Sequence, residues 1–186
     1  MLEEKELDKM VFVEQGQGVP LVLLHGLMGG LSNFKVSGLV LTGSSGLYEK
    51  SFGETIPRRG DYEYVKRKSE EVFYDPKIAT KEVVDDVFAT VNDRDRAIRT
   101  LYIARSAMQH NMNEEIKYIQ QPVGLIWGKQ DGVTPPEVAE QFHAGLPNST
   151  LFWVDKCGHA PMMEHPELFN ELLEKWLKDN QLNPKA

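Results

Sequence analysis

Short apolar runs along the chain predict β-strands that are buried on both faces. Four such runs occupy residues 19–24, 36–41, 123–127 and 151–154. Each run is nearly continuous in apolar residues and does not alternate with polar ones. This is the pattern of strands in a parallel sheet with both faces covered by helices.

Helical spacing of apolar residues dominates the stretch between the second and third runs. Thr80 and Asp93 stand where side-chain N-caps are expected, ahead of helices reaching Val91 and about Met108. Further helices are expected at residues 61–74, 114–119, 134–142 (with Thr134 as N-cap) and from Pro166 onwards. The predicted class is therefore α/β: a reduced, mostly parallel sheet flanked by helices, with a helical insertion.

Composition narrows the classes of protein that this chain can belong to. Its 186 residues suit one domain, and its net charge of −7 argues against a nucleic-acid partner. No apolar run approaches the roughly 18 residues of a membrane span, and the acidic N-terminus lacks the apolar core of a signal peptide. The lone Cys157 excludes an intrachain disulfide and fits a reducing compartment. We expect a cytoplasmic protein without a membrane partner.

Two chemically distinctive residues follow the last two strand-like runs. Asp131 comes after residues 123–127, and His159 comes after residues 151–154. Taken singly, Asp131 could be a turn residue and His159 an ordinary loop histidine. Their separation fits one helix plus one strand, which would bring both to the carboxyl edge of neighbouring parallel strands. There an acid can orient an imidazole and stabilise its protonated form, as in a nucleophile–histidine–acid site.

The nucleophile of such a site is missing from the sequence, because no G-x-S-x-G motif is present. Ser44 and Ser45 follow the second run, but neither has glycines at both −2 and +2, the spacing of a sharp nucleophile elbow. They and Ser32 are weak candidates. His25 is expected to be structural, and the remaining histidines to be solvated: His110, His143 and His165. No residue cluster has metal-ligand spacing, and no cofactor is expected.

Four ordered motifs resemble the α/β-hydrolase-fold family, of the small esterase and C–C-bond-hydrolase type. These are residues 21–27, 39–43, 126–131 with Pro135, and 158–164 with Pro166. The resemblance implies that Asp131 is the triad acid and His159 the base. It also implies an oxyanion hole at Gly26 and Leu27, with the N–H of Leu27 as a donor. Residues 1–47 and 121–186 would then form the core, and residues 48–120 a helical cap.

The chain departs from this family pattern between the first two strand-like runs. Only about a dozen residues separate them, which barely suffices for a parallel crossover, and the strand and elbow that carry the family's serine are absent. We expect an internal deletion of about 60 residues or more, equivalent to two βα units, with its junction near Lys35.

The expected function follows from what remains of the site. The chain is predicted to be a serine-hydrolase-type protein for carboxylic esters or C–C bonds, inactive or nearly so as written. Its substrate in the intact family form would be a small-molecule ester or ketone. The alternative is a non-catalytic small-molecule-binding or minimal-fold module. An apolar sheet edge left by the deletion would favour a homodimer or a strand swap.

Overall fold

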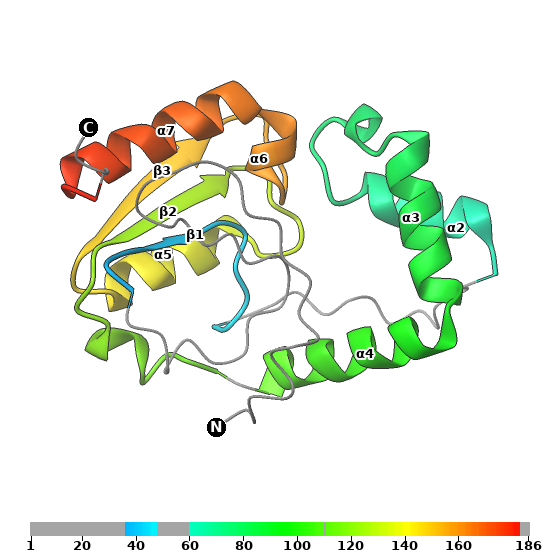
Figure 1. The fold of residues 1–186 in the computed structure, drawn as a ribbon, viewed down its shortest axis with the longest axis horizontal. Coiled ribbons are helices and arrows are strands. Elements are labelled where there is room, and N and C mark those ends of the chain that lie inside the picture. The colour runs from blue at the N-terminus through cyan, green and yellow to red at the C-terminus, as the bar shows by residue number, and fades with distance from the viewer. Residues whose placement is uncertain (1–35, 48–59, 110, 183–186) are drawn as a thin grey trace.

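The computed structural model describes residues 36–47, 60–109 and 111–182 (Figure 1). Within these ranges, strands β1 (Leu39–Leu41), β2 (Val123–Gly128) and β3 (Ser149–Val154) form a parallel sheet in the order β1-β2-β3. Leu39 is in register with Val123, and Leu125 with Leu151. The predicted α/β class with a reduced parallel sheet is confirmed.

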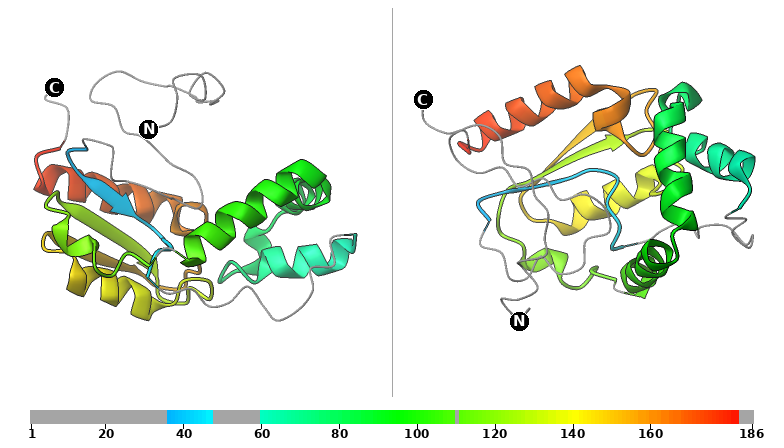
Figure 2. Two further views of the ribbon diagram at one scale, coloured as in Figure 1. Left: turned by 90° about the horizontal axis from the view of Figure 1, so that it is seen from below. Right: turned by 45° about the vertical axis from the view of Figure 1, so that its right-hand side comes forward.

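Helices cover both faces of this sheet, which explains why its strands lack an alternating pattern. Helix α5 (Pro136–Gly145) and helix α7 (Pro166–Asp179) lie on opposite faces (Figure 2). The first face packs side chains of β2 against α5: Val123, Leu125, Trp127, Val138, Ala139 and Phe142. On the other face, Ile126 and Val154 pack against Phe169, Leu172 and Leu173 of α7. All six residues of β2 are therefore buried.

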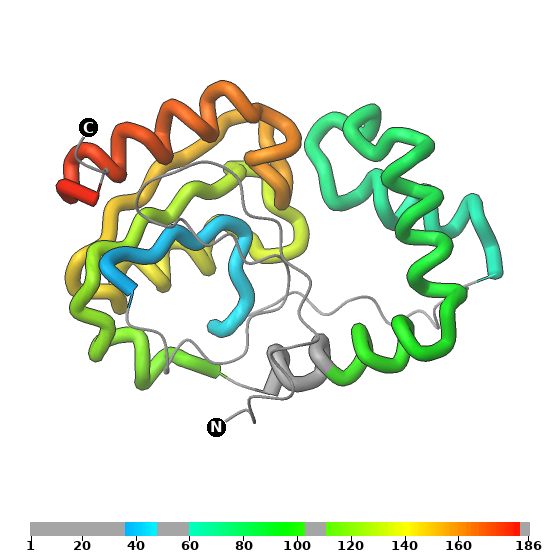
Figure 3. The backbone as a smooth tube through the Cα atoms, viewed as in Figure 1, coloured from blue at the N-terminus to red at the C-terminus, as the bar shows by residue number. Residues whose placement is uncertain are grey.

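Helices α2 (Tyr62–Glu70), α3 (Lys81–Asn92) and α4 (Arg94–Gln109), with the short 3-10 helix η2 (Pro76–Ile78), form a group that we call the helical segment. This group lies beyond the carboxyl ends of the strands (Figure 3). The predicted caps are confirmed: Thr80 Oγ1 accepts from Val83 N at 3.4 Å, and Asp93 Oδ1 from Arg96 N at 2.9 Å. A second 3-10 helix, η3 (Ile116–Tyr118), stands in place of the predicted helix 114–119.

One predicted cap is wrong. Helix α5 begins at Pro136 with Pro135 at its N-cap, so Thr134 does not cap it. The Thr134 hydroxyl donates instead to the Asp131 carboxylate at 2.9 Å. Pro136 has no N–H to donate to a cap at Thr134, and α5 begins at Pro136, one residue later than predicted.

Several sequence-based expectations fall on residues outside the described ranges. These are the strand-like run 19–24, His25, Gly26, Leu27, Ser32, the junction at Lys35, and His110. Within the ranges that are described, no helix is long and apolar enough to cross a membrane. The same ranges contain no group of three or more His, Cys, Asp or Glu side chains that could hold a metal ion.

Candidate active site

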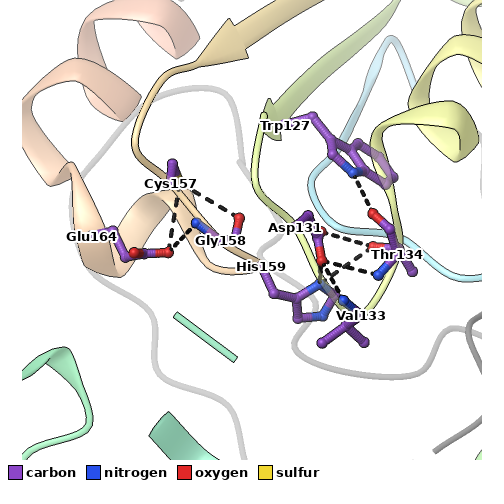
Figure 4. A network of polar contacts seen from close by, with 8 residues as sticks. All are labelled: Trp127, Asp131, Val133, Thr134, Cys157, Gly158, His159 and Glu164. Atoms are coloured by element: carbon purple, nitrogen blue, oxygen red, sulfur yellow. Dashed lines mark hydrogen bonds and ion pairs between the residues drawn. The ribbon is translucent and has the colours of Figure 1, made fainter. Parts of the chain in front are cut away.

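The Asp131 carboxylate is held in the loop that follows β2, with none of its side chain exposed. Its Oδ1 accepts from the backbone N–H of Val133 at 2.8 Å and of Thr134 at 3.0 Å. Its Oδ2 accepts from Thr134 Oγ1 (Figure 4). Trp127 Nε1 donates to the Thr134 carbonyl at 2.9 Å and so anchors this turn to the core. Because three donors bind its two oxygens, the carboxylate is held in one orientation.

His159 meets this carboxylate from the loop after β3. Its Nδ1 lies 3.0 Å from Asp131 Oδ2 and 3.2 Å from Oδ1. Thr134 Oγ1 is 3.3 Å from the same nitrogen, but its proton is committed to Asp131. We therefore assign the His159 proton to Nδ1, where it is donated to Asp131, which leaves a lone pair on Nε2. The His159 side chain is 29% exposed, so Nε2 chemistry has access from solvent.

The loop after β1 packs directly on the imidazole. Gly43 has a φ of +54°, and a Cβ placed there would lie 2.8 Å from His159 Nδ1. Only glycine takes this backbone conformation without strain and leaves room for the ring. Gly43 belongs to the motif at residues 39–43, but no local pattern in the sequence connects it with His159.

The serine candidates do not complete the site within the described residues. Ser44 and Ser45 follow Gly43 and are partly buried. No hydrogen bond joins either of them to His159 in the part of the chain that the structure describes. His143 lies elsewhere, with its Nδ1 2.8 Å from Ser149 Oγ, and His165 Nε2 lies 2.9 Å from the Lys156 carbonyl oxygen.

Cys157 is close to His159 in sequence but is not a nucleophile candidate. Its side chain is fully buried, and that burial, reinforced by the Glu164 carboxylate, raises the pKa of the thiol to about 12. Because the thiolate is the reactive form, the thiol is inert at neutral pH.

The chain is similar to several known proteins. A family model described as "alpha/beta hydrolase fold" matches residues 75–166, which include Asp131 and His159. The chain is similar to the solved structure of MGS-MChE2, an alpha/beta hydrolase enzyme from the metagenome of sediments from the lagoon of Mar Chica, Morocco. The identity is 36%, covering 91% of this chain and 94% of that one, with a TM-score of 0.58.

More distant relatives are longer than this chain. It is 29% identical to the uncharacterized hydrolase YugF of Bacillus subtilis, over 76% of this chain and 56% of YugF. It is 28% identical to 2-hydroxy-6-oxononadienedioate/2-hydroxy-6-oxononatrienedioate hydrolase 2 of Pseudomonas putida, over 85% of this chain and 54% of that protein. The chain thus spans about half the length of these curated relatives. The meta-cleavage product hydrolase CumD of Pseudomonas fluorescens, at 18% identity, shares the fold, with a TM-score of 0.60 over 75% of this chain and 55% of that one.

Proposed function

Because this chain belongs to the α/β-hydrolase-fold family, we propose that it is a hydrolase of the serine type, for carboxylic esters or C–C bonds, that retains the acid and the base but not the usual nucleophile. The observation that carries this proposal is the 3.0 Å contact between His159 Nδ1 and the buried Asp131 carboxylate. The Pseudomonas putida relative is named as a hydrolase of a 2-hydroxy-6-oxo-dioate, whose oxo group is a ketone, and this supports a small ester or ketone as the substrate class.

In a complete site of this type, each retained residue has a defined step. A serine Oγ would attack the substrate carbonyl carbon and pass its proton to Nε2 of His159. Asp131 would stabilise the resulting imidazolium, and the N–H of Leu27, beside Gly26, would hold the oxyanion. His159 would then return the proton to the leaving group. Without an elbow serine, only residual catalysis from binding and oxyanion donors is expected.

A fluorophosphonate probe tests this function directly. We expect no labelled serine in intact and peptide mass spectra, and no ester turnover above that of a His159→Gln variant. His143→Gln is the matched control, because His143 is exposed on α5 and contacts only Ser149 among the described residues. Labelling at Ser32, Ser44 or Ser45 that depends on His159 would support catalysis by a replacement nucleophile and would contradict the expected inactivity. MGS-MChE2, 94% of which this chain covers, is an alpha/beta hydrolase enzyme, so turnover by this chain is the outcome that the experiment must exclude.

The alternative is a module that binds a small molecule without turnover. Its support is the helical segment, which lies beyond the carboxyl ends of the strands, where ligands bind in open α/β sheets. We propose that residues 48–120 form a cap over that edge. Saturable shifts of the His159 ring signals with a ketone or ester, without product, would favour the module over the hydrolase.

Two further proposals concern the whole chain. We propose an internal deletion near Lys35; an intact gene that encodes a continuous chain with no missing insert relative to its relatives would contradict it. We also propose self-association through the β1 side of the sheet, since among the described residues β1 pairs only with β2. Sedimentation equilibrium at micromolar concentrations is expected to show a dimer, and a monomer throughout would contradict it.

A further inference from the structure

The loop that carries His159 is bound on both sides by hydrogen bonds that the sequence motif does not reveal. We call residues 155–160 the histidine loop. On one side, His159 N donates to the Val72 carbonyl at 2.9 Å, just after helix α2. On the other side lies the one-turn helix α6 (Pro161–Glu164), in which Glu164 N donates to the Ala160 carbonyl at 3.0 Å. This turn folds the Glu164 side chain back toward the histidine loop.

The Glu164 carboxylate joins these two sides. Its Oε1 accepts from Gly158 N at 2.7 Å, one residue before His159, as Figure 4 shows. Its Oε2 accepts from Tyr74 N at 2.8 Å and more weakly from Asp75 N at 3.4 Å. Tyr74 and Asp75 lie between α2 and η2, about 90 residues earlier in the chain. A single charged group thus satisfies backbone donors from two distant segments.

At Gly158, the backbone of the histidine loop packs closely against the backbone of residues 72–75. A Cβ added to Gly158 would lie 2.6 Å from the Val72 carbonyl oxygen and 2.8 Å from Tyr74 N. The two backbones are therefore in contact, with no room for a larger residue between them. A carboxylate is the side-chain group that can accept hydrogen bonds on both of its oxygens at once, and hydrogen bonds to a charged acceptor are stronger than neutral ones.

We propose that Glu164 is a positioning residue. Its carboxylate ties the histidine loop to residues 72–75, so that the His159 imidazole stays against Asp131 and the helical segment stays docked beside the site. Glu164 touches neither reacting atom and acts through the backbone of Gly158 and His159. The proposal rests on His159 as the base of the proposed function, but its test measures no turnover.

The test uses the full chain with Glu164→Gln and Glu164→Ala. Glutamine keeps the size of the side chain but replaces one accepting oxygen with an NH₂ donor, so it can serve only one of the two segments. Glu171→Gln is the matched control, because it removes the same charge from an exposed position on α7. Amide hydrogen exchange at single residues and the ¹⁵N and ¹H signals of the His159 ring are measured by NMR.

In both Glu164 variants, we expect the amides of Gly158 and Tyr74 to exchange about tenfold faster or more, while the amides of β2 keep their protection. The Nδ1–H signal of His159 should broaden or disappear, as its hydrogen bond to Asp131 loosens. Glu171→Gln should change neither. If Glu164→Ala does not fold, Glu164→Gln carries the test.

Unchanged Nδ1–H signals and unchanged local exchange in a folded Glu164→Gln would overturn the proposal. An equal loss of protection at β2 and at Gly158 would also overturn it, since that marks general destabilisation. Neither result bears on the fluorophosphonate experiment, so failure of the positioning role and failure of the hydrolase assignment are distinguishable.

Discussion

At the scale of single residues, the site depends on Thr134 as much as on the charged pair. Thr134 is fully buried, donates its hydroxyl proton to Asp131 Oδ2, and lies 3.3 Å from His159 Nδ1. By committing its proton to the acid, it leaves Nδ1 of His159 as the donor toward Asp131. The hydroxyl therefore helps to fix both the carboxylate and the histidine tautomer.

Replacing Thr134 with valine is expected to lower the free energy of unfolding by about 1–2 kcal/mol, because the buried carboxylate loses a donor that water cannot replace. Urea denaturation measures the change. Thr134→Ser is the control: it keeps the hydroxyl, so it should retain the His159 Nδ1–H signal in NMR spectra, whereas the valine variant should weaken it. Equal loss of that signal in both variants would assign the effect to the methyl group and packing.

Gly43 offers a second test at this scale. Alanine there must adopt a φ of +54° and place its Cβ 2.8 Å from the His159 ring, so we expect a loss of at least about 1 kcal/mol in unfolding free energy from backbone strain alone. Gly132→Ala is the control, since a Cβ at Gly132 has no neighbour within 4 Å. Urea denaturation of both variants checks the prediction, and equal stability would contradict it.

At the scale of elements, the site is a product of the central strand. β2 is covered by α5 on one face and α7 on the other, and its end delivers Asp131 at the sheet edge. Trp127, with no exposed surface, packs against Phe142 and also holds the Thr134 carbonyl. The core and the active-site turn therefore share one side chain.

We expect Trp127→Phe to lower the free energy of unfolding by about 2 kcal/mol or more, because it leaves a void and an unpaired carbonyl. Its register partner on β3, Trp153, is only partly buried, so Trp153→Phe is the matched control and should cost about half as much or less. Thermal and urea denaturation would measure both. A larger loss at position 153 would show that the β3 face carries more of the core than its burial indicates.

The elements were predictable from sequence where one local signal decided them. The continuous apolar run at residues 123–127 and the caps at Thr80 and Asp93 each depend on neighbours within a few residues, and the structure confirms these elements. Thr134 was assigned wrongly as a cap because the assignment overlooked that Pro136 has no N–H to donate to it. The contacts of Gly43 with His159 and of Glu164 with Tyr74 join segments far apart in the chain, and no local pattern encodes them.

At the scale of the whole molecule, we expect the free energy of unfolding to fall at alkaline pH because of one buried thiol, Cys157. Burial raises the pKa of Cys157 from about 9 to about 12 in the folded state, so the folded chain binds that proton more tightly than the unfolded chain. The contribution of the protonated thiol to the free energy of unfolding is complete below about pH 9 and is lost as the pH rises toward 12. The slope is up to about 1.4 kcal/mol per pH unit.

Urea denaturation of the wild type and of Cys157→Ala, compared at several pH values between 8 and 12, isolates this contribution. The alanine variant is expected to lose less stability as the pH rises. The pKa of Tyr62, hydrogen-bonded to Asp85, and that of Lys81, beside the same carboxylate, are also raised. Both groups titrate in each protein and cancel in the difference. If the free energy of unfolding changed equally with pH in the two proteins, Cys157 would not be the source of the pH dependence.

Asp131 and His159 are only 28 residues apart in the chain, in the loops that follow two adjacent strands joined by a single helix. One short continuous stretch of gene therefore encodes both residues, together with the hydrophobic layer beneath them. Segments earlier in the chain still contribute, because Gly43 packs on the imidazole and the Val72 carbonyl accepts from His159 N. Grafting residues 121–182 with and without those earlier segments would therefore show how much of the Asp131–His159 geometry this stretch holds by itself.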